Sequence, residues 1–535
     1  MATDQFIIIP VGLLSLAEYL NRFGYKTRIV NLGAAMQGAS QFDVERYISG
    51  VDADVYGIDL HWCVHSHGAI EIARICKKYH PNSLVILGGL TATRFHDEIM
   101  KEYPFVDAIV RGEGEKPTIQ LAENISKNGN LEDVKNLTYR TSKGKIRINP
   151  RTIPSKTIDD FNFTRLDLLE PRNAVGWWNI PVCRGCTFNC ATCGGSAYSY
   201  RKLFGMDKPA FRSPEKIVED LHLLSQQGAK QVFLFQDVRM GGKKYAKKLI
   251  EMLSKVDSLD RLSMELFTPA SSEFLDDLSK LKVPLSLSIS PESGDENVRR
   301  HHGRYYSNSA LLRTVEKCRN RRIRLGVFFM VALGFDDAAS IQNTMDLYEL
   351  VFRIDRLHRD DGKEAEYPSP LWSKPEIGPM VLLDPGSLAF DDPQRYGYRL
   401  VFEGIQDYYG GLSRPSWDQW VSYETRNYAR KEIARIILEL IGYNIDMEEK
   451  YGLYEMDLGK MQLDCERFIN SLDHLVIDEF GGPAGHVRNE GMLSQVHNVM
   501  KRLGPNSITS TDWEEYGPTV YKIVHESTGL MSGSA

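Results

Sequence analysis

Residues 181 to 195, PVCRGCTFNCATCGG, place four of the chain's eight cysteines within eleven positions. In a reducing compartment, cysteines this close together indicate metal binding or catalysis rather than a disulfide framework. Cys186, Cys190 and Cys193 form a C-x3-C-x2-C pattern, and Cys183 stands before them at the end of the strand-like run WNIPV. The fold must therefore present a loop that keeps these thiols together.

Two familiar metal sites match the spacing poorly. A structural zinc site would use the two C-x2-C pairs, but only three residues separate them, far fewer than between zinc knuckles. A ferredoxin site has the order C-x2-C-x2-C-x3-C-P, and its final proline is absent here. Three cysteines on one loop can instead hold three irons of a four-iron cluster and leave the fourth open to a ligand.

Length and composition restrict the setting of this loop. A chain of 535 residues predicts two or three domains. The hydrophobic content of 42% and the mean hydropathy of −0.32 are typical of soluble proteins, and no apolar run reaches membrane-span length. No secretory signal pattern is visible at the start, so we expect a cytoplasmic protein. The net charge of −6 argues against a nucleic-acid partner.

The first 145 residues alternate strand-like and helical patterns, which predicts an α/β fold with a doubly wound, Rossmann-like parallel sheet. The expected strands are 6–9, 27–30, 55–58, 84–87 and 108–110, with helices beginning near residues 13, 44, 68, 93 and 116. Ligands of such sheets bind beyond the carboxyl ends of the strands.

The residues at these strand ends are the candidate ligand contacts of the sheet. They are Pro10, Gly12, Leu60, His61, Trp62, Gly88, Gly89, Thr91, Gly112, Glu113 and Gly114. Glycines there let a bulky ligand approach the backbone, although ordinary tight turns between strand and helix would use them too. His61, His65 and His67 are not predicted to bind a metal, because no carboxylate or cysteine has ligand spacing to them.

A second series of strand-like runs follows the cysteine loop, ending with residues 377–383. Together with the strand before the loop they make six βα units, which predicts a partial parallel barrel with its active site at the strand carboxyl ends. The polar or small residues at these ends are Gln236, Asp237, Glu265, Glu292, Ser293 and Gly334.

The C-x3-C-x2-C loop resembles the signature of the radical S-adenosylmethionine (SAM) superfamily. The resemblance implies that Cys186, Cys190 and Cys193 hold a [4Fe-4S] cluster whose open iron is chelated by the amine and carboxylate of SAM. An electron from the cluster would cleave the sulfonium to give a 5′-deoxyadenosyl radical. Gly194 and Gly195 would form a backbone turn beside the cofactor, and Cys183 would be a spare thiol.

The stretch SPESG resembles the family element that binds the ribose of SAM, which implies that role for Glu292. A carboxylate suits it, because it can accept two hydrogen bonds from a cis-diol. The alternative for Glu292 is a charge that stabilises the beginning of a helix.

A doubly wound domain before such a barrel resembles the cobalamin-binding class of the superfamily. The resemblance covers about residues 1 to 350 and includes PVGLLSLAEYLNRFGYKTRIV, GGLTA and RGEGE. It implies cobalamin between the sheet's carboxyl edge and the barrel mouth. The expected domains are a cobalamin-binding-like domain at 1–145, a linker at 146–177, the barrel at 178–360 and a mostly helical C-terminal domain at 361–535.

The C-terminal region is predicted to cap the barrel and to influence substrate choice. Its clearest element is an amphipathic helix. The apolar residues of this helix are Ile433, Ile436, Ile437, Leu440 and Ile441. We expect Trp417, Trp420 and Tyr423 to pack inward rather than to contact substrate.

The resemblance implies an oxygen-sensitive enzyme, and within it a methyltransferase that acts on an unactivated carbon through methylcobalamin. The rivals are a radical SAM cyclase or rearrangement enzyme with or without cobalamin, a non-catalytic iron–sulfur or cobalamin sensor, and a zinc-binding interaction protein. A small molecule, a lipid or a peptide remains open as the substrate, and a flavodoxin or ferredoxin is the expected reductant.

Overall fold

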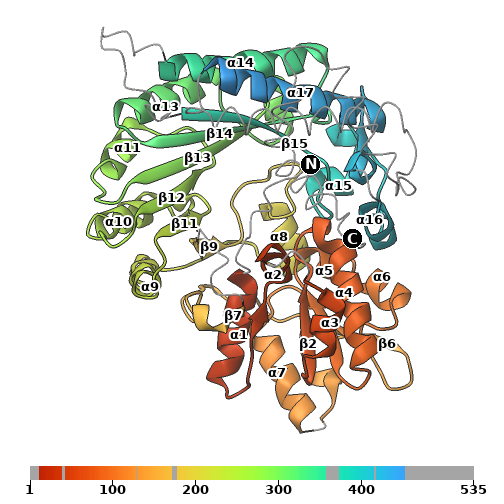
Figure 1. Cartoon of the computed structure of the whole chain (residues 1–535). Coiled ribbons are helices and arrows are strands. Elements are labelled where there is room, and N and C mark those ends of the chain that lie inside the picture. The colour runs from red at the N-terminus through yellow and green to blue at the C-terminus, as the bar shows by residue number, and fades with distance from the viewer. Residues whose placement is uncertain are drawn as a thin grey trace, which may run out of the picture.

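The computed structural model describes residues 11–38, 42–127, 129–170, 178–356, 373–414 and 417–451. Figure 1 shows three parts: a sheet domain in red and orange, a barrel in green, and a C-terminal segment in cyan and blue that touches both. The predicted α/β architecture is confirmed, and the predicted strand at 6–9 lies outside the described residues.

The sheet domain has five strands in the order β2-β3-β4-β5-β6. The three parallel strands β2 (Val55–Asp59), β3 (Leu84–Gly88) and β4 (Ala108–Val110) confirm the predictions for these segments. An antiparallel hairpin, β5 (Leu137–Arg140) and β6 (Ile146–Ile148), extends the sheet past the expected domain end at 145.

The predicted strand at 27–30 is wrong as a member of this sheet. Only Ile29–Val30 (β1) is extended, and it pairs in parallel with β7 (Leu169–Glu170) in a separate two-stranded sheet. The apolar pattern indicates extended backbone but does not choose the partner strand, and here the partner is the segment that leads into the barrel.

Five of the seven described helices of this domain begin within three residues of a predicted start, whereas α2 (Leu32–Gly38) and α6 (His96–Glu102) were not predicted. The other five are α1 (Val11–Arg22), α3 (Val44–Ser49), α4 (Ser66–Tyr79), α5 (Leu90–Arg94) and α7 (Glu115–Ser126). In α4, Ile70, Ala73 and Cys76 are buried at helical spacing, so one face of this helix packs into the core.

Six parallel strands in the order β15-β14-β13-β12-β11-β8 confirm the predicted partial barrel. They are β8 (Trp178–Pro181), β11 (Gln231–Phe235), β12 (Arg261–Leu266), β13 (Leu285–Glu292), β14 (Arg324–Val331) and β15 (Ser373–Pro379). The helices of the barrel units include α9 (Pro214–Gln226), α10 (Lys243–Leu253), α11 (Ser272–Leu278), α12 (Glu296–His301), α13 (Asn308–Asn320) and α14 (Ala338–Arg356).

The last strand lies four residues earlier than the predicted 377–383. Its pairing with β14 ends at Val331 opposite Pro379, so residues 380–383 leave the sheet where β14 itself ends. Because β15 also lies beyond residue 360, the barrel continues past the expected domain boundary.

The C-terminal segment packs against both the sheet domain and the barrel. Helix α17 (Arg430–Lys450) buries Ile433, Ile437 and Leu440, as its amphipathic pattern predicts, and packs on β15 beside α14 (Figure 1). Helix α16 (Ile405–Leu412) packs against α4 of the sheet domain.

The aromatic residues of the C-terminal segment pack as predicted at two positions. Trp417 and Tyr423 are buried, and Tyr423 lies in β17 (Tyr423–Thr425), which pairs antiparallel with β16 (Tyr398–Leu400). Trp420 is only partly buried and lies at the edge of the central cavity. In the described ranges, no helix is both long and apolar enough to span a membrane.

Candidate functional site

The cysteine loop lies between β9 (Cys183–Arg184) and α8 (Ala197–Phe204), at the carboxyl end of β8. The thiols of Cys186, Cys190 and Cys193 are half-buried. Burial raises the pKa of each, and the charges of Asp384, Cys190 and Cys186 add to the rise at Cys193. A bound iron cluster would offset this cost by stabilising the thiolates.

Backbone donors already point at two of these sulfurs. The N–H of Phe188 donates to Cys186 Sγ and the N–H of Gly195 donates to Cys193 Sγ, both at 3.3 Å. Such bonds stabilise cluster thiolates, so the donor set fits a [4Fe-4S] cluster.

Cys183 has a different environment from the other three thiols. It is buried on β9, its Sγ donates to the carbonyl of Gly185 at 3.4 Å, and burial raises its pKa far above the usual range. The structure thus buries this thiol within the fold, and its assignment as a spare stays a prediction.

A buried carboxylate that the sequence analysis missed lies behind the loop. Asp384 Oδ2 accepts the N–H of Gly194 at 2.9 Å, and its Oδ1 accepts the thiol of Cys63 at 3.7 Å. Burial raises the pKa of Asp384 to about 6. A Cβ on Gly194 would lie 3.0 Å from Asp384 Cβ, so this glycine permits close packing, and Asp384 joins the cysteine loop to the sheet domain.

Glu292 ends β13 with a positive φ of 68°. Its Oε1 accepts Arg304 Nε at 2.8 Å, whereas its buried Oε2 has no partner among the described residues. The charges of both residues act on Cys190, which places the pair beside the cluster site. An unpaired buried oxygen here fits a hydroxyl donor such as a ribose. Arg304 itself was not predicted.

We expect Glu292→Gln to weaken SAM binding about tenfold, because one charged acceptor is lost while an amide oxygen remains for Arg304. Equilibrium dialysis of the reconstituted protein measures this, with iron content unchanged. Ser293→Ala is the control, because the Ser293 hydroxyl lies 3.4 Å from Thr344 Oγ1 and is buried. Equal affinity for SAM in Glu292→Gln and the parent would contradict the ribose role.

The other predicted barrel-end residues divide into two groups. Gln236 and Glu265 line the central cavity, and the backbone N–H of Gln236 donates to the Glu265 carboxylate. Asp237, in contrast, binds Arg239 at 2.6 Å and accepts the N–H of Phe267 at 2.8 Å.

Ser293 and Gly334 also serve packing rather than the cavity. A Cβ at Gly334 would lie 1.9 Å from the carbonyl oxygen of Tyr396, so this glycine lets the C-terminal segment approach. Neither residue lines the central cavity, and their cofactor contacts stay predictions.

A cavity of about 3450 Å³ lies between the carboxyl edge of the sheet and the barrel interior. It contains ten predicted cofactor contacts: Gly12, His61, Trp62, Gly88, Gly89, Gly112, Glu113, Gly114, Gln236 and Glu265. Leu60 and Thr91 are instead buried in the sheet domain, where Thr91 Oγ1 donates to the His61 carbonyl, and Pro10 lies outside the described residues.

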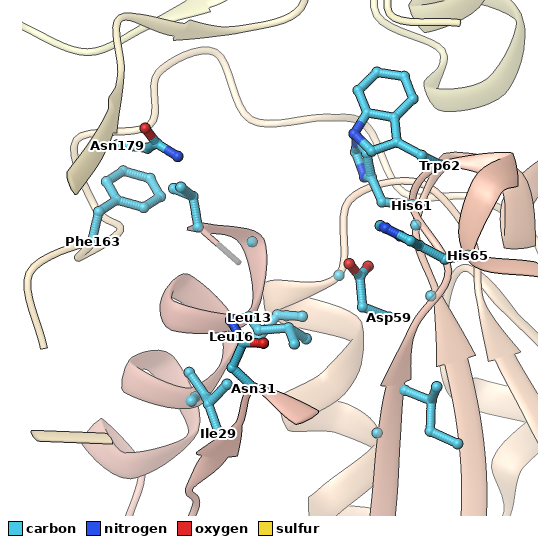
Figure 2. A pocket seen from close by; sticks show the side chains of 18 of the residues that line it. Leu13, Leu16, Ile29, Asn31, Asp59, His61, Trp62, His65, Phe163 and Asn179 are labelled. Atoms are coloured by element: carbon cyan, nitrogen blue, oxygen red, sulfur yellow. The ribbon is translucent and has the colours of Figure 1, made fainter. Parts of the chain in front are cut away.

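One wall of the cavity carries Asp59, His61, Trp62 and His65, whose side chains Figure 2 shows grouped together, opposite Phe163 and Asn179. Burial lowers the pKa of His61 to about 4, so its imidazole is neutral at pH 7. Trp62 also approaches the cysteine loop, since a Cβ on Gly195 would lie 3.8 Å from its indole. The two candidate cofactor sites therefore adjoin.

Glycines shape this wall in two ways. Gly89 has a φ of 111°, and a Cβ there would lie 2.6 Å from His61 Cα, so glycine is required for the loop after β2 to pack. A Cβ on Gly12 would have no neighbour within 4 Å, which leaves room for a ligand. The open edge, its glycines and the cavity volume fit a corrinoid.

His67 does not join this wall group, because its Nδ1 lies 3.2 Å from the carbonyl oxygen of Tyr409. Within the ranges that the structure describes, no three His, Cys, Asp or Glu side chains are arranged to hold a single metal ion. The three loop thiols are proposed instead as ligands of a cluster, in which each thiolate binds a different iron.

The acidic residues of RGEGE join the two domains. Arg184, in the cysteine loop, lies 2.5 Å from Glu115 Oε1 and 3.2 Å from Glu113 Oε1. Ser15 Oγ donates to Glu115, and the N–H of Ser155 donates to Glu113. The Glu113 carboxylate thus pairs with Arg184, and because the residue also borders the cavity its predicted cofactor contact stays a prediction.

Comparisons with known proteins match these two domains. The family model described as the Radical SAM superfamily matches residues 180–348, and the B12 binding domain matches residues 1–122. An uncharacterized methyltransferase of Pyrococcus horikoshii is 29% identical over 242 residues, covering 44% of this chain and 50% of that one. Hopanoid C-3 methylase of Methylococcus capsulatus is 26% identical over 44% of each chain.

A relative with a different named activity is also similar. The anaerobic magnesium-protoporphyrin IX monomethyl ester cyclase of Rubrivivax gelatinosus is 27% identical, covering 43% of this chain and 41% of that one. This chain thus spans about half the length of the curated relatives it matches.

Solved structures agree on the fold. The radical SAM methyltransferase TsrM from Kitasatospora setae, with cobalamin and a [4Fe-4S] cluster bound, aligns with a TM-score of 0.55 at 15% identity, over 74% of this chain and 78% of that one. The cobalamin-dependent radical SAM enzyme OxsB aligns with a TM-score of 0.55 at 13% identity, over 100% of this chain and 80% of that one.

Proposed function

We propose that this chain, which belongs to the proteins combining a B12 binding domain with a radical SAM domain, is a cobalamin-dependent radical SAM methyltransferase. The proposed reaction is methylation of an unactivated carbon. The observation that carries the proposal is the adjacency of the cysteine loop and the glycine-edged wall of the sheet domain, across one cavity. The relatives named as methyltransferases support the reaction class.

Different residues of this chain would bind the cluster, SAM and the corrinoid. Cys186, Cys190 and Cys193 would hold the cluster, and Glu292 would accept hydrogen bonds from the ribose of SAM. His61 and Trp62 would form part of the binding surface for the corrinoid. Bound together, the cluster, SAM and methylcobalamin would supply electron transfer, hydrogen abstraction and a methyl donor.

Burial at this cavity shifts the pKa of nearby titratable groups in the direction that favours their neutral forms. Burial raises the pKa of Asp59 to about 6 and lowers that of His61 to about 4. At pH 7 the imidazole offers an uncharged surface to a corrin ring. A flavodoxin or ferredoxin in the cytoplasm is the proposed electron source.

The test begins with anaerobic reconstitution of the full chain and analysis of iron, sulfide and corrinoid. We expect about four irons and one corrinoid per chain. Incubation with S-adenosylmethionine labelled in its methyl group and candidate substrates should then place label in a product. Four irons without corrinoid would overturn the cobalamin part, and turnover to an unlabelled cyclised product would favour the activity named for the Rubrivivax relative.

A further inference from the structure

The barrel interior is open and polar. In β12, Leu262, Met264 and Leu266 are buried, whereas Arg261, Ser263 and Glu265 alternate with them and line the cavity. In β13, Ser286, Ser288 and Ser290 likewise stand at alternate positions and line the cavity. Inward-facing residues of closed barrels are normally bulky and apolar, so this row of small hydroxyl side chains leaves space for a polar molecule.

Two arginines occupy the amino-terminal end of this interior. Arg261 is the first residue of β12 and Arg324 is the first residue of β14, and both line the cavity. Burial and then the charge of Arg261 lower the pKa of Arg324, so the two guanidinium groups repel each other. Within the described part of the chain, neither guanidinium group makes a hydrogen bond or an ion pair.

Lys374, the neighbouring cation on β15, differs from the two arginines because it has acidic partners. Lys374 Nζ lies 3.4 Å from Glu376 Oε1 and 3.1 Å from Glu448 Oε1. Two half-buried guanidinium groups without an acid between them are unfavourable unless an anion completes the site.

We propose that Arg261 and Arg324 together bind an oxyanion, a carboxylate or a phosphate, at one end of the substrate. The proposal rests on the proposed function, because it assigns the far end of the same substrate cavity. Guanidinium groups bind such anions through paired hydrogen bonds, which gives both affinity and orientation.

The position of the pair also sets the shape of the substrate. Arg261 precedes Glu265 by four residues on β12, which is about 13 Å along a strand. Glu265 lies at the cluster end, because its charge acts on Cys186. The substrate is therefore elongated, with its anion on the order of 10 Å from the reacting carbon and polar groups along the serine row.

The experiment measures binding to the anaerobically reconstituted full chain. The probes are 4-nitrophenyl phosphate, 4-nitrobenzoate and the neutral 4-nitrobenzamide, titrated by calorimetry. We expect one of the anionic probes to bind at least about tenfold more tightly than the amide, and its identity separates phosphate from carboxylate. Arg261→Gln and Arg324→Gln should each weaken that probe about tenfold, and the double variant should remove the preference.

Arg147→Gln is the matched control, because Arg147 lies exposed on β6, away from the cavity. Arg261→Lys and Arg324→Lys keep the charge and protect the fold, and they should retain part of the preference. Equal binding of the three probes to the parent, or a preference retained in the double glutamine variant, would overturn the proposal.

Iron and corrinoid are measured on the same samples. Corrinoid loss in the glutamine variants would also overturn the proposal, since it would assign the arginines to the cofactor. A parent that prefers anions but holds no corrinoid would refute the proposed methyl transfer and leave the anion site standing.

Discussion

Replacing any one of Cys186, Cys190 and Cys193 with alanine is expected to lower bound iron from about four per chain to nearly none. With two thiolates left on a short loop, the cluster loses an iron ligand at a half-buried position that water would then reach. Iron and sulfide analysis after anaerobic reconstitution, together with the optical spectrum, measures the loss.

The control variants are Cys183→Ala and Cys318→Ala. Cys183 is buried on β9 and Cys318 is buried on α13. Each control variant therefore makes the same cysteine-to-alanine change as the test variants, but leaves the three proposed ligands in place. Both should retain most of the iron. Loss of iron in Cys183→Ala equal to that in the other three would refute the three-ligand assignment.

Arg184→Met is expected to destabilise the protein by about 3–5 kcal/mol, because it leaves two buried carboxylates, Glu113 and Glu115, without their cation. Chemical denaturation under anaerobic conditions measures the change. Since Arg184 lies in the cysteine loop and its partners in the sheet domain, we also expect poorer retention of iron and corrinoid.

Two variants test whether this loss comes from uncompensated charge. Adding Glu113→Gln and Glu115→Gln to Arg184→Met should recover much of the stability, because the buried negative charges disappear. Arg165→Met breaks an exposed pair with Asp167 and should change stability by less than about 1 kcal/mol. A loss in Arg184→Met no larger than in Arg165→Met would contradict the role of the pair in joining the domains.

The same pair predicts a pH dependence. Burial would raise the pKa of Glu115, but the charge of Arg184 more than offsets this, so the pKa lies below its usual value. The stability that the pair contributes is present above the unfolded-state pKa of about 4.3 and is lost as pH falls through the lower folded-state value. Arg184→Met should flatten this part of the stability curve.

Local sequence pattern determined much of the architecture. The strands at 55–59, 84–88 and 108–110 and the helix over 430–450 follow from periodic apolar residues, because a buried face repeats at the spacing of its own element. The cysteine spacing specified the cluster loop, because all of its ligands lie within eight positions of one another. The six-stranded barrel followed from counting strand–helix units between residues 178 and 383.

Only the tertiary structure decided how distant segments meet. It paired β1 with β7, placed Asp384 behind Gly194, and turned Glu113 toward Arg184. It also placed Arg261 and Arg324 at one cavity, where neither guanidinium group has an acidic partner among the described residues. A sequence pattern reports which face of an element is buried, whereas the partner of a buried charge is chosen by the packing of segments far apart in the chain.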